Sequence, residues 1–297
     1  MSTSSPALDA PEDLARHAVL LPRPARLSSR LLRSELRLVF LRRRNLAMLV
    51  VLAMAPVLLG FAIKVGGGDD GSGGGPAFIG RITSNGLFLA FTSLVVALPL
   101  FLPLAVAVVS GESIAGEASV GTLRSLLVVP VGRSRLLAVK YAGIVAYATV
   151  ATLVVAATGI LMGLLLFPTG PVTLLSGTTI SFADALLRVF LVAVYVSAML
   201  AGIAAVGLFI STLTEVPLAA MASTAILVVV VEILETVPQI DAIHPYLFTH
   251  WWLAFGDLIR DPVSLDQMGH GIAVHAVYVV VFGSLAWARL TSKDVSS

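Results

Sequence analysis

The chain has 297 residues, of which 58% are hydrophobic and only 12% are charged, and its formal net charge is +2. Soluble domains contain about 25% charged residues, so this composition and its long apolar runs exclude an ordinary soluble protein and indicate an integral membrane protein. The chain contains no cysteine, which excludes a disulfide framework, a thiolate metal site and a cysteine nucleophile.

The N-terminal region is expected to lie outside the hydrocarbon. Residues 1–27 contain four prolines among serines and alanines and are predicted to form a flexible cytoplasmic tail. Residues 28–44 can form a helix with separate arginine and leucine faces, as interfacial amphipathic helices have; a charged extension of the first span is the alternative. The arginines would also suit a nucleic-acid arm, but an apolar run follows them at once, so we expect no nucleic-acid partner.

Six apolar segments follow, within a transmembrane domain predicted for residues 45–290. At a rise of 1.5 Å per residue, each is long enough to cross about 30 Å of hydrocarbon. Thr214 is expected to cap the fifth helix after a tight hairpin, and Pro217 to lie in its first turn. The predicted spans lie near 45–64, 87–110, 141–167, 186–212, 216–237 and 271–290.

The distribution of basic residues predicts the orientation. With the N-terminus inside, the outer side receives only four of the 19 lysines and arginines, namely Lys64, Arg81, Arg188 and Arg260. This bias predicts that both termini are cytoplasmic and that residues 291–297 form a short cytoplasmic tail.

Aromatic residues and histidines gather in the longest outer loop, residues 238–270. They predict an interfacial belt with a short re-entrant or surface helix, and they include His244, Tyr246, Trp251 and Trp252. A metal site at His244 and His250 is the alternative, but the neighbouring aromatics favour an interfacial or hydrogen-bonded role, so no metal is expected.

The sequence contains no enzyme motif: a P-loop, Gly-x-Ser-x-Gly and His-Glu-x-x-His are all absent. We therefore expect no catalytic residue and no cofactor bound by this chain. The deep parts of the spans contain hydroxyl groups, which can bond to backbone carbonyls. A transport path is predicted to use Thr92, Ser93, Ser223, Thr224 and Glu232. Glu232 is either a carboxylate at the outer surface or in an aqueous cavity, or a direct participant in transport.

A polar segment, residues 110–140, lies between the second and third spans. Glu112 and Glu117 suit the first turns of a helix, where the helix dipole favours negative charge, and leucines follow as an apolar stripe. Pro130 would end this helix, and Gly132 would allow a turn before the third span. The pattern predicts a short rigid helix that protrudes into the cytoplasm; an ordinary helical loop is the alternative.

This segment resembles the cytoplasmic coupling element of ABC transporter permeases of the ABC-2 type exporter superfamily. The six spans, the interfacial helix and the long outer loop before the sixth span also resemble that family. The matching residues are Glu117, Gly121, Thr122, Leu126, Leu127, Pro130, Arg133, Ser134, Leu136, Leu137 and Lys140.

The resemblance implies an all-α, type V exporter-like fold in the bacterial inner membrane. It implies a second permease copy, identical or paralogous, and two copies of a separate ATP-binding subunit, which binds ATP and Mg. The partner would contact Glu112, Glu117, Gly121, Thr122, Arg124, Leu126, Leu127, Pro130, Arg133 and Arg135. The expected cargo is a hydrophobic or amphipathic compound such as a drug, an antibiotic or a lipid. The alternatives are a non-transporting membrane scaffold or sensor, and an ion-coupled secondary transporter.

Overall fold

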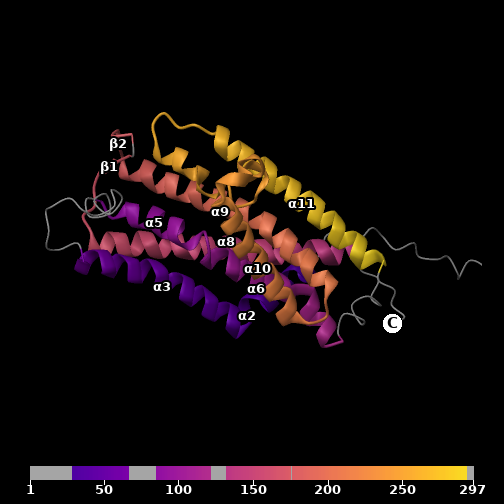
Figure 1. The fold of residues 1–297 in the computed structure, drawn as a ribbon. Helices are drawn as coiled ribbons and strands as arrows, with labels where there is room; N and C mark the ends of the chain where they lie inside the picture. The colour runs from indigo at the N-terminus through magenta and orange to yellow at the C-terminus, as the bar shows by residue number, and fades with distance from the viewer. Residues whose placement is uncertain (1–28, 67–84, 122–131, 175, 293–297) are drawn as a thin grey trace, which may run out of the picture.

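The structure is a computed structural model that describes residues 29–66, 85–121, 132–174 and 176–292. The chain is almost entirely helical in these ranges (Figure 1). Its α-helices are α2 (Ser29–Leu41), α3 (Arg43–Gly66), α5 (Leu87–Ala97), α6 (Phe101–Ser119), α8 (Arg133–Leu166), α9 (Phe182–Leu213), α10 (Pro217–Glu235) and α11 (Asp266–Ser292). The tail predicted for residues 1–27 and most of the tail predicted for residues 291–297 lie outside the described residues.

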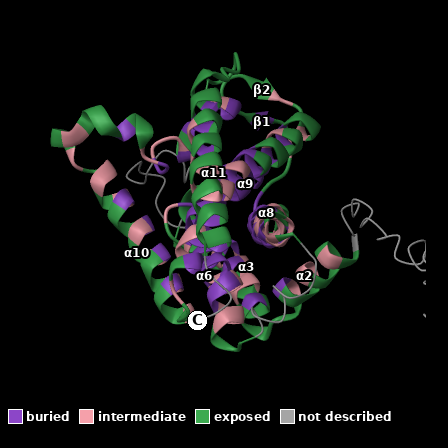
Figure 2. Ribbon diagram, turned by 90° about the vertical axis from the view of Figure 1, so that its right-hand side faces the viewer, coloured by how far each residue is buried: buried purple, intermediate pink, exposed green. Residues whose placement is uncertain are grey.

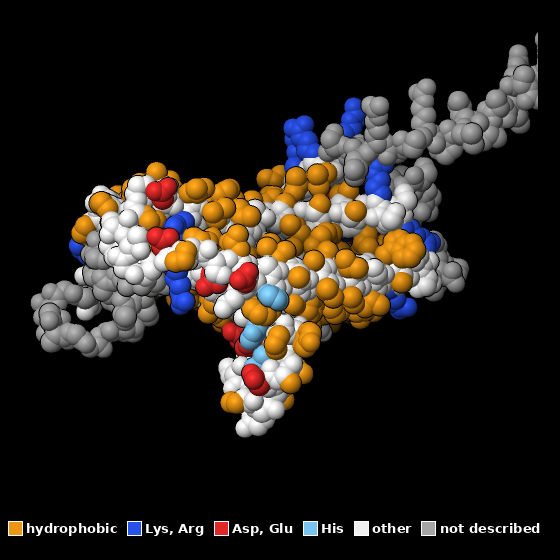
Figure 3. Space-filling model, turned by 90° about the horizontal axis from the view of Figure 1, so that it is seen from above, with side chains coloured by type: hydrophobic (Ala, Val, Ile, Leu, Met, Phe, Trp, Pro, Cys, Tyr) orange, Lys and Arg blue, Asp and Glu red, His pale blue; other side chains and the backbone are white. Residues whose placement is uncertain are grey.

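Six of the described helices are long and apolar enough to cross a membrane: α3, α6, α8, α9, α10 and α11. Hydrophobic side chains dominate the face seen in Figure 3, as expected for helices surrounded by lipid. The protein is therefore a multi-pass α-helical membrane protein, as the composition predicts. Three helices begin four or more residues before their predicted spans: α8 starts at Arg133, α9 at Phe182 and α11 at Asp266.

The prediction of one continuous second span at residues 87–110 is wrong. The segment forms two helices, because α5 ends at Ala97 and α6 begins only at Phe101. Pro99 and Pro103 cause this interruption, since neither has a backbone N–H and each ring clashes with the preceding helical turn. Pro99 lies at the break itself, so the sequence contained a residue that indicates this interruption of the helix. Beyond the break, α6 continues past the predicted end to Ser119.

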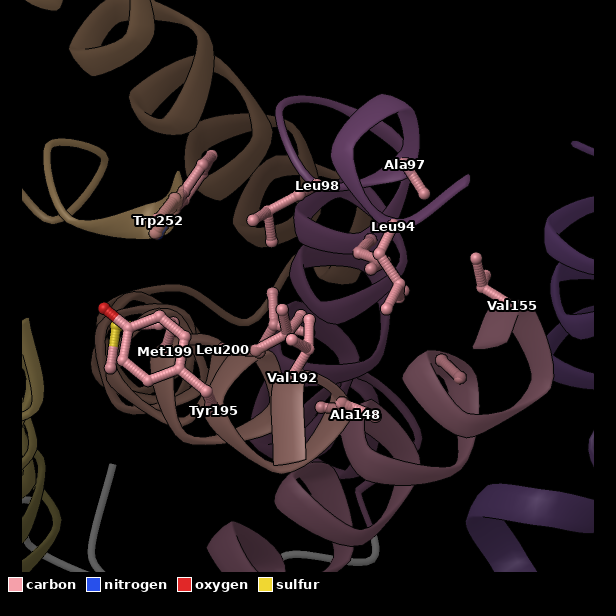
Figure 4. Close-up of a cluster of buried hydrophobic side chains, with 14 of the residues drawn as sticks. Leu94, Ala97, Leu98, Ala148, Val155, Val192, Tyr195, Met199, Leu200 and Trp252 are labelled. Carbon is pink, nitrogen blue, oxygen red and sulfur yellow. The ribbon is translucent and has the colours of Figure 1, made fainter. Parts of the chain in front are cut away.

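Helix α9 occupies the middle of the bundle and packs against α11, α6 and α8. Figure 4 shows side chains of α5, α8 and η2 that surround those of α9, among them Leu94, Val155, Leu200 and Trp252. Trp252 is only 2% exposed, so its predicted place in an interfacial belt is wrong. In contrast, α10 exposes much of its surface (Figure 2).

The connections after α8 and after α10 contain short secondary structure of their own. A two-stranded antiparallel pair, β1 (Val172–Thr173) and β2 (Thr179–Ile180), follows α8. Two 3-10 helices, η1 (Pro238–Tyr246) and η2 (Trp252–Ile259), follow α10, in agreement with the short helix predicted for this loop.

The connection between α9 and α10 is the tight hairpin that the sequence predicts. Helix α9 ends at Leu213, and Pro217 is the first residue of α10. The predicted cap is wrong, because Val216 occupies the N-cap position without a side-chain hydrogen bond. The Thr214 hydroxyl instead accepts a hydrogen bond from the Val216 backbone N–H at 3.1 Å, within the turn.

The antiparallel helices give the bundle two distinct ends. We use the name terminal end for the end that contains the last residue of α2, α6, α9 and α11 and the first of α3, α8 and α10. The name loop end denotes the opposite end, where β1 and β2 lie.

Candidate functional site

The predicted coupling residues do not begin a separate helix at Glu112. Glu112 and Glu117 lie in the last two turns of α6, which runs without interruption from the span. The helix ends beside Gly121, whose φ of +75° is the left-handed conformation that glycine adopts at helix C-termini. The predicted contact residues Thr122, Arg124, Leu126, Leu127 and Pro130 lie outside the described residues, so a coupling helix there stays a prediction.

Lys140 of α8 joins three helices at the terminal end. Its Nζ lies 3.1 Å from Oε1 of Glu35 in α2 and 2.5 Å from Oε1 of Glu117 in α6. The lysine side chain is only 3% exposed, and the two carboxylates are also largely shielded. Removing one partner from such a shielded cluster is far more costly than removing a surface charge.

A second group of charges lies beside the first. Arg42 Nη1 is 2.6 Å from Oε2 of Glu112, and Arg44 pairs with the same oxygen. Both arginines are nearly half exposed, so solvent weakens these contacts. All of these residues except Arg44 line one cavity of about 30 Å³. The name terminal junction denotes the six residues of the two groups, Glu35, Lys140, Glu117, Arg42, Arg44 and Glu112. Its three cations and three carboxylates balance in charge.

Local packing brings α2 against α8. A Cβ on Gly143 of α8 would lie 3.1 Å from Cγ of Glu35, so glycine permits this close approach. Asn45 Nδ2 donates to the Val39 carbonyl at 2.8 Å, and Tyr147 Oη donates to the Asn45 carbonyl at 3.1 Å.

The prediction of a separate helix before the first span is confirmed, although it ends at Leu41 rather than at residue 44.

Ser211, near the end of α9, connects α9 to α6, the helix that contains Glu112 and Glu117 of the junction. Its hydroxyl donates to the Gly111 carbonyl of α6 at 2.6 Å and accepts from the Ala115 N–H at 2.9 Å. The serine thus stands between two backbone groups of α6 that would otherwise face each other in the helical ladder. Sequence reasoning missed this role, because a serine near a helix end suggests only a local cap.

We expect Ser211→Ala to lower the free energy of unfolding by about 1–3 kcal/mol, because the substitution removes a buried hydroxyl that bonds both an N–H and a carbonyl. Ser197→Ala is the matched control, since Ser197 is also buried in α9 but donates only to the Ala193 carbonyl of its own helix. Thermal unfolding of both variants in one detergent measures the difference. Equal losses in the two variants would contradict the role of Ser211.

The residues predicted to form a transport path do not converge in one chain. Thr92, Ser93 and Thr224 each donate to a carbonyl of their own helix, while Ser223 is exposed. Helix α5 packs mainly against α8 and α3, whereas α10, which contains Glu232, packs mainly against α6 and α9. The helix packing within one subunit therefore does not form a transport path through these residues.

Histidines connect the segment after α10 to the last residues of that helix. His250 Nδ1 lies 2.5 Å from Oε1 of Glu235, and His244 Nε2 donates to the Leu234 carbonyl at 3.2 Å. Histidine and acidic side chains gather on a projecting lobe in Figure 3. In the described ranges, no group of three or more potential metal ligands occurs.

The remaining predicted loop residues have different surroundings. Trp251 Nε1 donates to the Pro245 carbonyl at 2.9 Å, and its ring stacks on His270 with centroids 5.5 Å apart. Tyr246 is 71% exposed, as an interfacial residue would be.

Comparison with curated proteins finds no match. Residues 73–296 match a protein family described as Protein of unknown function (DUF2705). The match begins after α2 and α3, so it includes Glu112, Glu117 and Lys140 of the terminal junction but not Glu35, Arg42 or Arg44. Because the matched residues form most of the sequence, the chain belongs to this DUF2705 family.

Proposed function

We propose that this protein is the membrane-spanning permease subunit of an ATP-driven exporter of the ABC-2 type. The observation that supports the proposal is the contact between Glu117 and Lys140. This contact joins the end of α6 to the first turns of α8, the two helices that flank residues 120–132. That connection is part of the segment that resembles the coupling element of ABC-2 permeases.

In the proposed mechanism, a separate ATP-binding subunit binds ATP and Mg and pushes on this connection. Glu117 and Lys140 make α6 and α8 respond together, and Glu35 adds α2 to the moving group. Ser211 passes the displacement of α6 to α9. This chain therefore transmits motion, and the hydrolysis of ATP takes place on the partner.

The positive-inside rule supports a cytoplasmic location of the terminal end, because most arginines of the described residues belong to α2 or lie near that end. We propose that the protein lies in a bacterial inner membrane with both termini inside, and that two permease copies pair with two ATP-binding subunits. The cargo we propose is hydrophobic or amphipathic, since the spans are apolar and several of their hydroxyls bond within their own helices.

Glu117→Gln tests this proposal in the purified complex with the ATP-binding protein, reconstituted in lipid. The substitution weakens a charged hydrogen bond worth about 1.5–3 kcal/mol. We expect the amount of cargo exported per ATP hydrolysed to fall about tenfold or more, while the subunits still co-purify. Arg30→Gln is the matched control, because Arg30 is an exposed residue of α2.

Other outcomes would support the alternatives. A protein that exports without an ATPase and stops when the proton gradient is dissipated is an ion-coupled transporter. A protein that binds partners without moving any compound is a scaffold or sensor.

A further inference from the structure

A groove lies between α8, α9 and α11, with a volume of about 170 Å³. Its space arises because small residues from all three helices, Ala138, Ala205 and Gly283, meet there. Larger apolar side chains, Leu137, Leu208 and Val279, form its walls. None of these residues belongs to the terminal junction.

An apolar groove in a membrane helix bundle has to be filled. Atoms that line an empty space lose their dispersion contacts. The hydrophobic effect does not favour another protein helix over lipid as the occupant, since lipid chains are as apolar as leucine. The surrounding leaflet therefore always supplies an acyl chain that can occupy the groove.

Two arginines lie at the terminal end of the helices that form the groove. Arg133 precedes Ser134, a lining residue, and its Nη1 donates to the Leu290 and Thr291 carbonyls at 3.2 and 2.6 Å. These bonds hold one guanidinium edge against the end of α11 and leave the other N–H donors available. Arg289, in the last turn of α11, is exposed. Neither arginine forms an ion pair within the part of the chain that the structure describes.

We propose that this groove binds an acyl chain of an anionic phospholipid of the cytoplasmic leaflet, with the lipid phosphate held by Arg133 and Arg289. Basic pockets between transmembrane helices on the cytoplasmic side are suited to anionic headgroups. Trp287, half exposed one turn before the end of α11, suits the headgroup level. The inference uses the cytoplasmic orientation of the terminal end but does not depend on ATP-driven transport.

Gly283→Leu tests the groove directly. An added Cβ at Gly283 meets no atom within 4 Å, so leucine fills the groove without pushing the helices apart. Gly269→Leu is the matched control, because Gly269 lies in the same helix, also has open space and is outside the groove. The full-length protein is placed in nanodiscs with equal amounts of phosphatidylglycerol and phosphatidylcholine, and the retained lipids are counted by native mass spectrometry.

The wild type and Gly269→Leu are expected to retain phosphatidylglycerol in preference to phosphatidylcholine, whereas Gly283→Leu loses the retained lipid. Arg289→Gln is expected to keep the chain site but to lower the preference for phosphatidylglycerol about fivefold, the effect of one interfacial charge. Because Arg289 is exposed, this second variant remains informative if Gly283→Leu fails to fold.

Three results would overturn the inference. The first is equal phosphatidylglycerol retention by Gly283→Leu and Gly269→Leu. The second is equal retention of the two lipids by the wild type. The third is a Gly283→Leu variant that keeps its lipid but alone loses a subunit contact, or alone loses export, since the groove would then be an interface or a cargo path. Lipid counting requires no ATPase, so failure of the transport proposal leaves this test intact.

Discussion

Replacement of Lys140 by methionine is expected to lower the free energy of unfolding by about 3–5 kcal/mol. The substitution removes the cation that lies between Glu35 and Glu117, whose side chains are only 13% and 17% exposed. The two negative charges would then face each other across a site with little water. Unfolding in mixed micelles of increasing SDS content, followed by circular dichroism, measures the loss.

The triple variant Glu35→Gln, Lys140→Met and Glu117→Gln separates charge from packing. It keeps similar side-chain volumes and contains no charge at this position, so we expect it to recover most of the stability that Lys140→Met loses. Arg37→Met is the control on the exposed face of α2 and should change the free energy by less than about 0.5 kcal/mol. If Lys140→Met is no less stable than Arg37→Met, the junction does not hold the three helices together.

Gly163→Ala is the second change with a large expected effect, at the loop end. A Cβ at residue 163 of α8 would lie 2.7 Å from the carbonyl carbon of Gly86 and still closer to its oxygen. The obstacle is backbone, which cannot rotate away, so α5 must move off α8. We expect the unfolding free energy to fall by about 3 kcal/mol, at the upper end of the effects of overpacking.

Gly66→Ala is the control for this prediction, because an added Cβ at the end of α3 meets no atom within 4 Å. Thermal unfolding of both variants in the same detergent gives the comparison. Similar melting temperatures for the two variants would show that α5 and α8 do not pack as closely as described.

Composition and hydropathy were sufficient to predict the membrane class, most of the spans and the hairpin before Pro217, because these features depend on neighbouring residues. The interruption near Pro99 could also have been predicted, since it depends only on the chemistry of proline. The misplaced start of a helix at Glu112 has a different origin. The preference of carboxylates for helix N-termini is weak, and the packing of α6 against α9 and α10 outweighs it.

The terminal junction could not be predicted from local patterns. Glu35 and Lys140 are 105 residues apart in sequence, and each alone resembles an ordinary charge near a membrane surface. Their contact depends on the close approach of two helices at Gly143. The bridging role of Ser211 likewise depends on tertiary packing, because its partners are in α6.

The interruption of the second span has a mechanical consequence. The carbonyls of Val95 and Pro99 have prolines four residues ahead, at 99 and 103, so neither receives the usual helical hydrogen bond. We therefore expect the short linkage between Ala97 and Phe101 to act as a pivot if α6 is displaced. A displacement of α6 in the proposed mechanism would then tilt this helix relative to α5, whose start packs closely against α8 where Gly86 lies against Gly163.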